Sequence, residues 1–348
     1  MNLTIIRLLL LAVIVANTTL NIFAQDVHFS QASSSPLTLN PALAGANNVT
    51  QAIVNYRTQW RSVASPYSTI AASFDMRLNE ASRQKKGIFA MGLNLYNDQS
   101  GDLNLATTNA NLNMAYHLLI DRQSTIGGGI YIGFGQRSIS TSSGQWANQF
   151  NGDFYDANLQ SGEAAFADKI NYFDVGTGFV YTYRGSENYM TRNDQKEYNV
   201  GFAVYHLNRP DYSFMAAKNE QLYMRFSGFA NAIIGINNSR NSLMPAIYFQ
   251  RQKTSTEFLF GTYWRYRIQE ASKVTGFNKG SYLSLGAFYR TNDALVAKAM
   301  FEMFDYSVGF AYDINVSSLT SVSKARGGFE LFLRYGLAKK NGAARSRI

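Results

Sequence analysis

The chain has 348 residues, no cysteine and a formal net charge of +9. The lack of cysteine excludes disulfide bonds and thiolate metal sites. Charged residues make up only 16% and aromatic residues 14%, whereas about a quarter of the residues in soluble domains are charged. The cations are scattered and form no basic patch interleaved with aromatic residues. This pattern argues against nucleic-acid binding and favours a basic lumen or contact with anionic lipid.

Residues 1–24 are typical of a secretory signal peptide. Arg7 precedes a short apolar run at 8–15, and small residues lead up to Ala24. The run is too short to cross a bilayer as a helix. We therefore expect cleavage after Ala24 rather than a retained membrane anchor. No cysteine follows that site, so we do not expect a lipoprotein.

Residues 25–48 form the next segment, which is almost free of charge. Pro36 and Pro41 bias the residues before them toward extended backbone, and Gly45 permits a turn. Its large apolar side chains are Phe29, Leu37, Leu39 and Leu43. A flexible exported tail would carry more charge. We therefore expect this segment to pack against the periplasmic mouth or the lumen of a barrel.

From residue 49 onward, segments of about ten residues alternate between apolar and polar side chains, which is the period of a strand. In STIAASFDMRL, Ile70 and Phe74 share one face and Ser73 and Asp75 share the other. The first face suits lipid and the second suits water. A soluble β-sandwich would also alternate, but it would cover its outer faces with charge.

About fourteen such segments follow one another, and an even number suits a closed barrel with both termini in the periplasm. Their centres lie near Val54, Ser73, Leu93, Leu112, Ile130, Phe179, Phe202, Phe229, Ile247, Phe260, Leu285, Ala299, Phe310 and Leu331. We predict an all-β fold: a transmembrane antiparallel β-barrel of outer-membrane type with about 14 strands, spanning residues 49–337. The basic residues 338–348 are expected to be a disordered tail.

One predicted strand carries a face of glycines. In STIGGGIYIGFGQ, Gly127, Gly129, Gly133 and Gly135 oppose isoleucines and a phenylalanine. Such a face lets a plug, a backbone or a partner segment approach closely, or it marks a tight bend of the barrel. Both interpretations remain open at this point.

Strand parity assigns the connections to the two sides of the membrane. The long connections at 137–169, 208–221 and 315–326 fall outside the cell, as is usual for such barrels. The connection at 268–280 is the exception, because parity makes this long segment periplasmic. Either it contacts periplasmic machinery or the strand count is wrong there.

The sequence contains no strong pattern for catalysis. The three histidines, His28, His117 and His206, have no metal-ligand spacing. Asp98 and Asp102 flank a loop glycine but lack the spacing of a calcium loop. We expect no enzyme, no metal and no cofactor. A Ser-His pair assembled across strands, as in a barrel hydrolase, is the alternative.

Several blocks resemble the PorP/SprF family of outer-membrane proteins from Bacteroidetes. They are FSQ at 29–31, SPLTLNPALAG at 35–45, Arg57-x-Gln59-Trp60, SPYST at 65–69, and the closing stretches 293–319 and 327–335. The positions carried over from the family are Phe29, Ser30, Gln31, Pro36, Asn40, Pro41, Gly45, Arg57, Gln59, Trp60, Pro66, Tyr312 and Asp313. We expect them to organise the N-terminal segment against the barrel or to bind a partner. Arg57 and Gln59 share the predicted inner face with Asn55, where they can donate hydrogen bonds to carbonyls of that segment.

The resemblance implies an outer-membrane component of the type IX secretion system, or an accessory to it, without catalytic activity. Its implied partner is a large secreted adhesin with a type B C-terminal sorting domain, of the kind used in gliding motility, alongside other secretion components. The barrel would support export or surface attachment of that adhesin. The alternative is a passive porin for small solutes. The tail after Leu337 departs from barrels that end on an aromatic residue, so the assembly signal is read internally at 331–335 or the tail is an addition.

Overall fold

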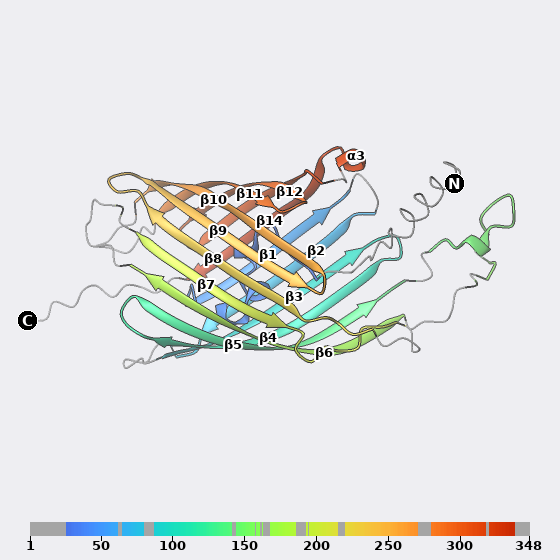
Figure 1. Ribbon diagram of the computed structural model, residues 1–348, viewed down its shortest axis with the longest axis horizontal. Coiled ribbons are helices and arrows are strands. Elements are labelled where there is room, and N and C mark those ends of the chain that lie inside the picture. The colour runs from blue at the N-terminus through green and yellow to red at the C-terminus, as the bar shows by residue number, and fades with distance from the viewer. Residues whose placement is uncertain are drawn as a thin grey trace, which may run out of the picture.

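The fold is a closed antiparallel β-barrel (Figure 1). The computed structural model describes residues 26–61, 65–79, 87–140, 144–156, 158–160, 162, 168–185, 193, 195–214, 220–270, 280–317 and 320–337. The strands are β1 (Thr50–Gln59), β2 (Tyr67–Arg77), β3 (Gly87–Ser100), β4 (Leu105–Leu119), β5 (Ser124–Ser138), β6 (Lys169–Arg184), β7 (Lys196–Tyr205), β8 (Arg225–Gly235), β9 (Asn241–Gln252), β10 (Ser255–Gln269), β11 (Ser281–Arg290), β12 (Ala294–Met303), β13 (Tyr306–Asn315) and β14 (Arg326–Leu337). The predicted signal peptide and C-terminal tail lie outside the described residues.

Each strand pairs with its neighbours in the chain, and β1 pairs with β14 to close the sheet. The closing register runs from Thr50 opposite Leu337 to Gln59 opposite Gly328, so each of the fourteen described strands pairs with two neighbours. The predicted fold class and strand count are confirmed, and every predicted segment centre falls within a strand. Along the described chain, no helix has the length and apolar character needed to cross a membrane.

The predicted alternation of faces is also confirmed. On β2, Ile70 is 54% exposed and Phe74 is 46% exposed, whereas Ser73 and Asp75 on the other face are buried. The outward apolar side chains form the surface that meets lipid, and the inward polar ones line the lumen. The same division holds on β3 and β6, as the sequence predicts.

The two ends of the barrel differ in their connections. The end where β1 stops, called here the long-loop rim, carries the connections at 139–168, 206–224 and 316–325. The short helices η4 (Ala147–Gln149) and α3 (Thr320–Ser323) lie at this end (Figure 1). The opposite end, called the terminal rim, is where β1 begins and β14 stops.

At the terminal rim, β10 stops at Gln269 and β11 begins at Ser281. The predicted strand count is therefore correct at this connection, which parity assigns to the periplasmic side in spite of its length. Most of that connection, residues 271–279, lies outside the described residues.

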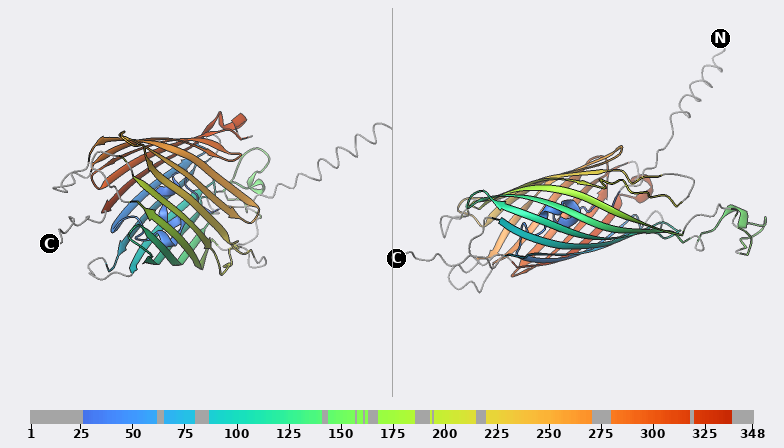
Figure 2. Two further views of the ribbon diagram at one scale, coloured as in Figure 1. Left: turned by 60° about the vertical axis from the view of Figure 1, so that its left-hand side comes forward. Right: turned by 90° about the horizontal axis from the view of Figure 1, so that it is seen from below.

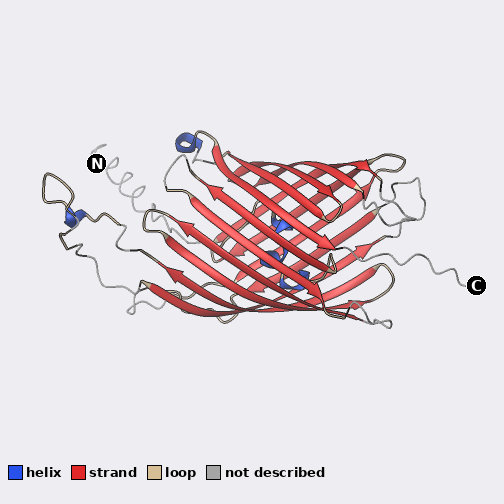
Figure 3. Ribbon diagram, turned by 180° about the vertical axis from the view of Figure 1, so that it is seen from behind, coloured by secondary structure: helices blue, strands red, loops and turns tan. Residues whose placement is uncertain are grey.

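Residues 26–49, called here the plug, lie inside the lumen. They form three short helices, η1 (Ala32–Ser34), α2 (Pro36–Leu39) and η2 (Pro41–Leu43), which are seen within the barrel in Figures 2 and 3. Pro36 and Pro41 each occupy the first turn of a helix, where the missing N–H is not needed.

The plug crosses the lumen from one rim to the other. Its first residue, Asp26, donates its backbone N–H to Gln252 at 2.9 Å, near the long-loop rim. Its last residue, Val49, donates to the carbonyl of Leu337 at 2.8 Å, at the terminal rim. The first and last described residues, Asp26 and Leu337, therefore lie at opposite rims. The cause is the passage of the plug through the barrel before β1 begins.

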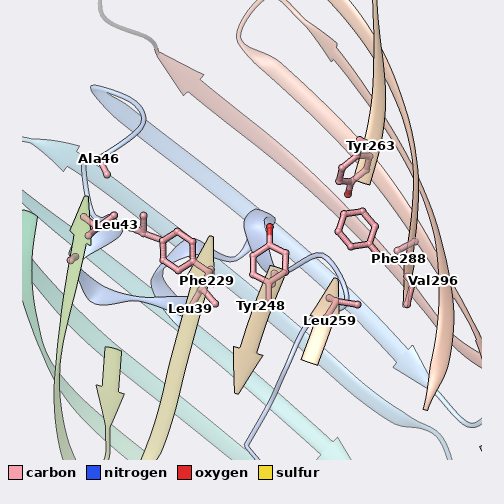
Figure 4. Packing of buried hydrophobic residues seen from close by; sticks show 13 residues of the cluster. Leu39, Leu43, Ala46, Phe229, Tyr248, Leu259, Tyr263, Phe288 and Val296 are labelled. Carbon is pink, nitrogen blue, oxygen red and sulfur yellow. The ribbon is translucent and has the colours of Figure 1, made fainter. Parts of the chain in front are cut away.

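The part of the lumen wall that β8 to β12 form carries a cluster of buried apolar side chains. Figure 4 shows Leu39 and Leu43 of the plug beside Phe229 and Tyr248. The same buried cluster continues along the wall to Leu259, Tyr263, Phe288, Val296 and Ala311. The polar inner face expected from the alternation is therefore found on only part of the wall. The plug explains the difference, because its apolar side chains need an apolar surface.

On the opposite wall, glycines of β5 and β6 leave room for the plug. A Cβ atom at Gly129 would lie 2.6 Å from the Cα of Ala42, and one at Gly178 would lie 2.0 Å from the Oδ1 of Asn40. Gly129 thus allows close approach of the plug. The other three glycines of this β5 face lie against side chains of the wall: Gly127 against His117, Gly133 against Asn111 and Gly135 against Tyr172.

We predict that Gly129→Ala lowers the free energy of unfolding by about 1–3 kcal/mol, because the new methyl group would overlap the plug backbone. The matched control is Gly128→Ala on the outer face, where a Cβ would meet nothing within 4 Å. This control should change stability by less than about 0.5 kcal/mol. Thermal unfolding in one detergent measures both variants. Equal midpoints would contradict the close contact.

Candidate functional site

The interface between the plug and the barrel wall is the candidate site, because the charged side chains of the lumen converge on it. The largest group joins Arg57 of β1, Arg290 of β11, Asp313 of β13 and Glu330 of β14, all at most 3% exposed. Arg57 Nε lies 3.1 Å from Glu330 Oε1, and Arg290 Nη2 lies 2.9 Å from Asp313 Oδ2. Two arginines face two carboxylates, and Arg290 Nη1 also lies 2.8 Å from Asp293 Oδ2, so each buried charge has an oppositely charged partner.

This four-residue group, called the Arg57 cluster, holds the start of the plug. The Oγ of Ser30 donates to Asp313 at 2.8 Å. The backbone N–H groups of Ser30 and Gln31 both donate to the Glu330 carboxylate, the latter at 2.8 Å. Arg57 donates to the carbonyl of His28. One carboxylate thus binds two successive amides while its arginine partner binds a carbonyl.

A second group, called the Asp26 clamp, lies at the long-loop rim. The Asp26 carboxylate contacts His206 Nε2 and lies 3.5 Å from Arg225 Nε. The other ring nitrogen of His206, Nδ1, lies 2.7 Å from Asp174 Oδ2. Asp174 also accepts from the hydroxyl of Tyr131. Because both ring nitrogens face carboxylate oxygens, both carry protons and the imidazole is charged.

His206 is held in an uncommon state by these neighbours. Burial disfavours its charged form, but Asp26 and Asp174 outweigh burial and raise its pKa to about 9. Its backbone has a φ of 58°, a left-handed conformation that few residues other than glycine adopt. The charged imidazole and the left-handed backbone of His206 both lie where the plug enters the lumen.

A third group binds the turn that leads from the plug into β1. Gly45 has a φ of 64°, and its N–H donates to Asp75 at 2.9 Å while its carbonyl accepts from Arg77 Nε at 2.7 Å. His117 Nε2 lies 2.7 Å from the carbonyl oxygen of Ala44, to which it donates. The carbonyl of Ala46 accepts from Arg77 Nη2 at 3.1 Å.

The middle of the plug is held by Asn40, which is fully buried. Its Nδ2 donates to the carbonyls of Phe179 and Phe202 at 2.9 and 3.2 Å. Its Oδ1 accepts from the N–H of Ala42 at 2.9 Å and so caps η2. A single side chain therefore links β6, β7 and the plug.

Most motif positions predicted from sequence converge on this interface. The positions buried in or beside the plug are Phe29, Ser30, Gln31, Pro36, Asn40, Pro41, Gly45, Arg57 and Asp313. Asn55 also contributes, because its amide donates to the carbonyl of Ser34 at 3.1 Å. Gln59, at the end of β1, is only half-buried.

Three predicted positions lie elsewhere. Trp60 stacks edge-on against Tyr67 with ring centroids 4.8 Å apart, and Pro66 is exposed in the same connection. Tyr312 is 43% exposed on the outer face of the barrel.

Several residues of the site were not predicted. Asp26, Asp174, His206, Arg225, Arg290 and Glu330 were absent from the motif positions. One pattern could have found part of this set: a charged side chain on the inner face of a predicted strand requires a partner once it is buried. All three histidines lie in the plug or contact it.

We predict that Arg57→Met destabilises the protein by about 3–5 kcal/mol, because the buried carboxylates of Asp313 and Glu330 would lose the guanidinium that lies 3.6 and 3.1 Å from them. Arg61→Met removes an exposed arginine of the long-loop rim and should cost less than about 0.5 kcal/mol. Denaturant unfolding in the same micelles compares the two variants. A small effect at both positions would contradict the structural role of the cluster.

Stability should also depend on pH through His206. Its pKa is 6.5 when unperturbed and about 9 in the fold, so its contribution is fully present below pH 6.5 and is lost as pH rises through about 9. The loss should be up to about 3 kcal/mol. Unfolding midpoints measured across this range should fall for the native chain and fall less for His206→Gln. A parallel decline in both proteins would refute the assignment to His206.

Comparison with solved structures gives similar barrels. A toluene transporter of Ralstonia pickettii has a TM-score of 0.49 and 12% identity, over 88% of this chain and 94% of that one. A FadL homologue of Pseudomonas aeruginosa has a TM-score of 0.44 and 10% identity, over 85% and 92%. BamA of Haemophilus ducreyi has a TM-score of 0.41 and 7% identity, over 83% and 70%.

Comparison with curated protein sequences gives no match. The sequence profile described as type IX secretion system membrane protein PorP/SprF matches residues 21–335. This range includes the plug and all strands except the last two residues of β14. The chain therefore belongs to the PorP/SprF family of type IX secretion system membrane proteins.

Proposed function

We propose that this barrel binds a secreted protein in the outer membrane and supports its export or attachment at the cell surface. The proposed partner is a large adhesin with a type B C-terminal sorting domain. Membership of a secretion-system family supports this function. Other components of the secretion system are proposed as further partners, and the role assigned to the barrel is binding rather than catalysis.

The filled lumen is the observation that carries the proposal. A barrel of this size is wide enough to leave a channel unless something occupies it. Here Leu39 and Leu43 of the plug pack against Phe229 and Tyr248 of the wall. Passive diffusion of solutes requires an open lumen, so the buried plug favours protein binding over a porin.

We also propose an orientation in which the long-loop rim faces the outside of the cell. Long connections usually face outward in such barrels, and short turns usually face the periplasm. The two longest connections, at 139–168 and 206–224, share this rim with the connection at 316–325. Exposed Phe150 and Phe154 in the first of them supply apolar surface for a partner. In this orientation the start of the plug would lie near the outer surface.

The test is purification of the protein, tagged after Ile348, from native outer membranes in mild detergent, with quantification of every protein that is retained. We expect one large secreted protein at close to a 1:1 ratio. An unrelated outer-membrane barrel with the same tag serves as the control. A preparation with no secreted protein enriched over that control would refute the proposal.

A further inference from the structure

The lumen holds the plug mainly through the plug backbone. Wall side chains contact the backbone at Asp26, Val27, His28, Ser30, Gln31, Ser34, Leu37, Thr38, Ala44, Gly45 and Ala46. Arginines bind carbonyls and carboxylates bind amides. Contacts of this kind recognise the direction and the path of a backbone, and they do not require particular side chains.

The side chains of the plug impose a simple chemical requirement. Asp26 is its only Asp, Glu, Lys or Arg. Its leucines enter apolar parts of the lumen: Leu37 packs with Ala44 and Ala115, and Leu39 and Leu43 join the Phe229 cluster. A peptide with a free backbone, a carboxylate at the position of Asp26, small uncharged residues elsewhere and leucines at similar spacing would make the same contacts with the wall.

The fit between plug and wall is incomplete. The side-chain amides of Gln31 in the plug and Asn94 in β3 are each 1% exposed, and neither amide finds a hydrogen-bond partner among the described residues. A buried polar group without a partner costs about 1–3 kcal/mol. A competing segment that bonds to Asn94, or that lacks an amide at the position of Gln31, would recover part of this cost.

We infer that the lumen is a peptide-binding site whose second occupant is a leucine-containing segment of the secreted partner that is uncharged apart from a carboxylate at the position of Asp26. That segment replaces residues 26–49 on the same arginines and carboxylates. The inference rests on the proposed function and deepens it, because it names the lumen as the binding site and a largely apolar peptide as the ligand. The plug then occupies the site while no partner is present.

A disulfide between the plug and the wall tests the inference. A Cβ at Gly92 would lie 3.5 Å from the Cβ of Ala44, which is within the range for a disulfide, once the flexible end of Leu37 moves aside. Ala44→Cys with Gly92→Cys would supply the only thiols, because the native chain has no cysteine. Oxidation would hold Ala44 against β3 and keep that end of the site occupied, and reduction would free it in the same folded sample.

The ligand in the experiment is a fluorescent synthetic peptide with the sequence of residues 26–49. Because the tethered plug competes at an effective concentration of about millimolar, the double-cysteine protein also carries Asn40→Ala. This change removes the plug's bonds to Phe179 and Phe202 and leaves the wall intact. Fluorescence anisotropy measures binding to the oxidised and reduced forms.

We expect saturable binding to the reduced form and at least tenfold weaker binding to the oxidised form. A control peptide with Leu37→Asp, Leu39→Asp and Leu43→Asp should not bind, because it would place charges in the apolar part of the lumen. Equal binding in both redox states, binding of the acidic peptide, or no binding to the reduced protein would each overturn the inference.

The secreted partner gives a second readout that separates the two proposals. The tagged double-cysteine protein, without Asn40→Ala, is purified from native membranes after oxidation and after reduction. A tenfold lower yield of partner from the oxidised sample supports the lumenal site. Equal retention in both states would refute the lumenal site and leave the proposed function standing. Absence of the partner from both samples and from the native protein would refute the proposed function itself.

Discussion

The balance of buried charge in the Arg57 cluster is the interaction on which the rest of the structure depends. Four ionised side chains lie almost without solvent, and each would be costly alone. Arg57 and Glu330 come from β1 and β14, the strands that close the barrel, whereas Asp313 lies on β13 and Arg290 on β11. The cluster therefore couples closure of the barrel to the position of the plug, because Ser30 and Gln31 complete its hydrogen bonds.

The remaining contacts divide the lumen into two halves with different chemistry. On the side of β5 and β6, glycines such as Gly129 and Gly178 let the plug backbone lie against the wall. On the side of β8 to β12, large apolar side chains pack against its leucines. This asymmetry explains how a short segment with few large residues fills a barrel of fourteen strands. Bulky side chains fill the lumen on one side, and on the other side the plug backbone lies directly against the wall.

An occupied lumen changes what the barrel can do in a secretion system. The proposed role is protein binding, and the wall already displays the groups that bind a polypeptide backbone. The Asp26 clamp joins the first described residue of the plug to β6, β8 and the connection after β7. The other end of the plug continues directly into β1. Release at the clamp would therefore leave the plug tethered at the terminal rim.

The sequence alone determined the strands, their number and their two faces, because an alternation of period two is local and repeats across the membrane thickness. It also placed Arg57 and Asn55 on the inner face, where both donate to plug carbonyls. Only the tertiary structure decided which distant charges meet. Asp26 and His206 are separated by 180 positions in the chain, and no local pattern relates them. Their contact depends on the register of closure and on the path of the plug, which residue spacing does not encode.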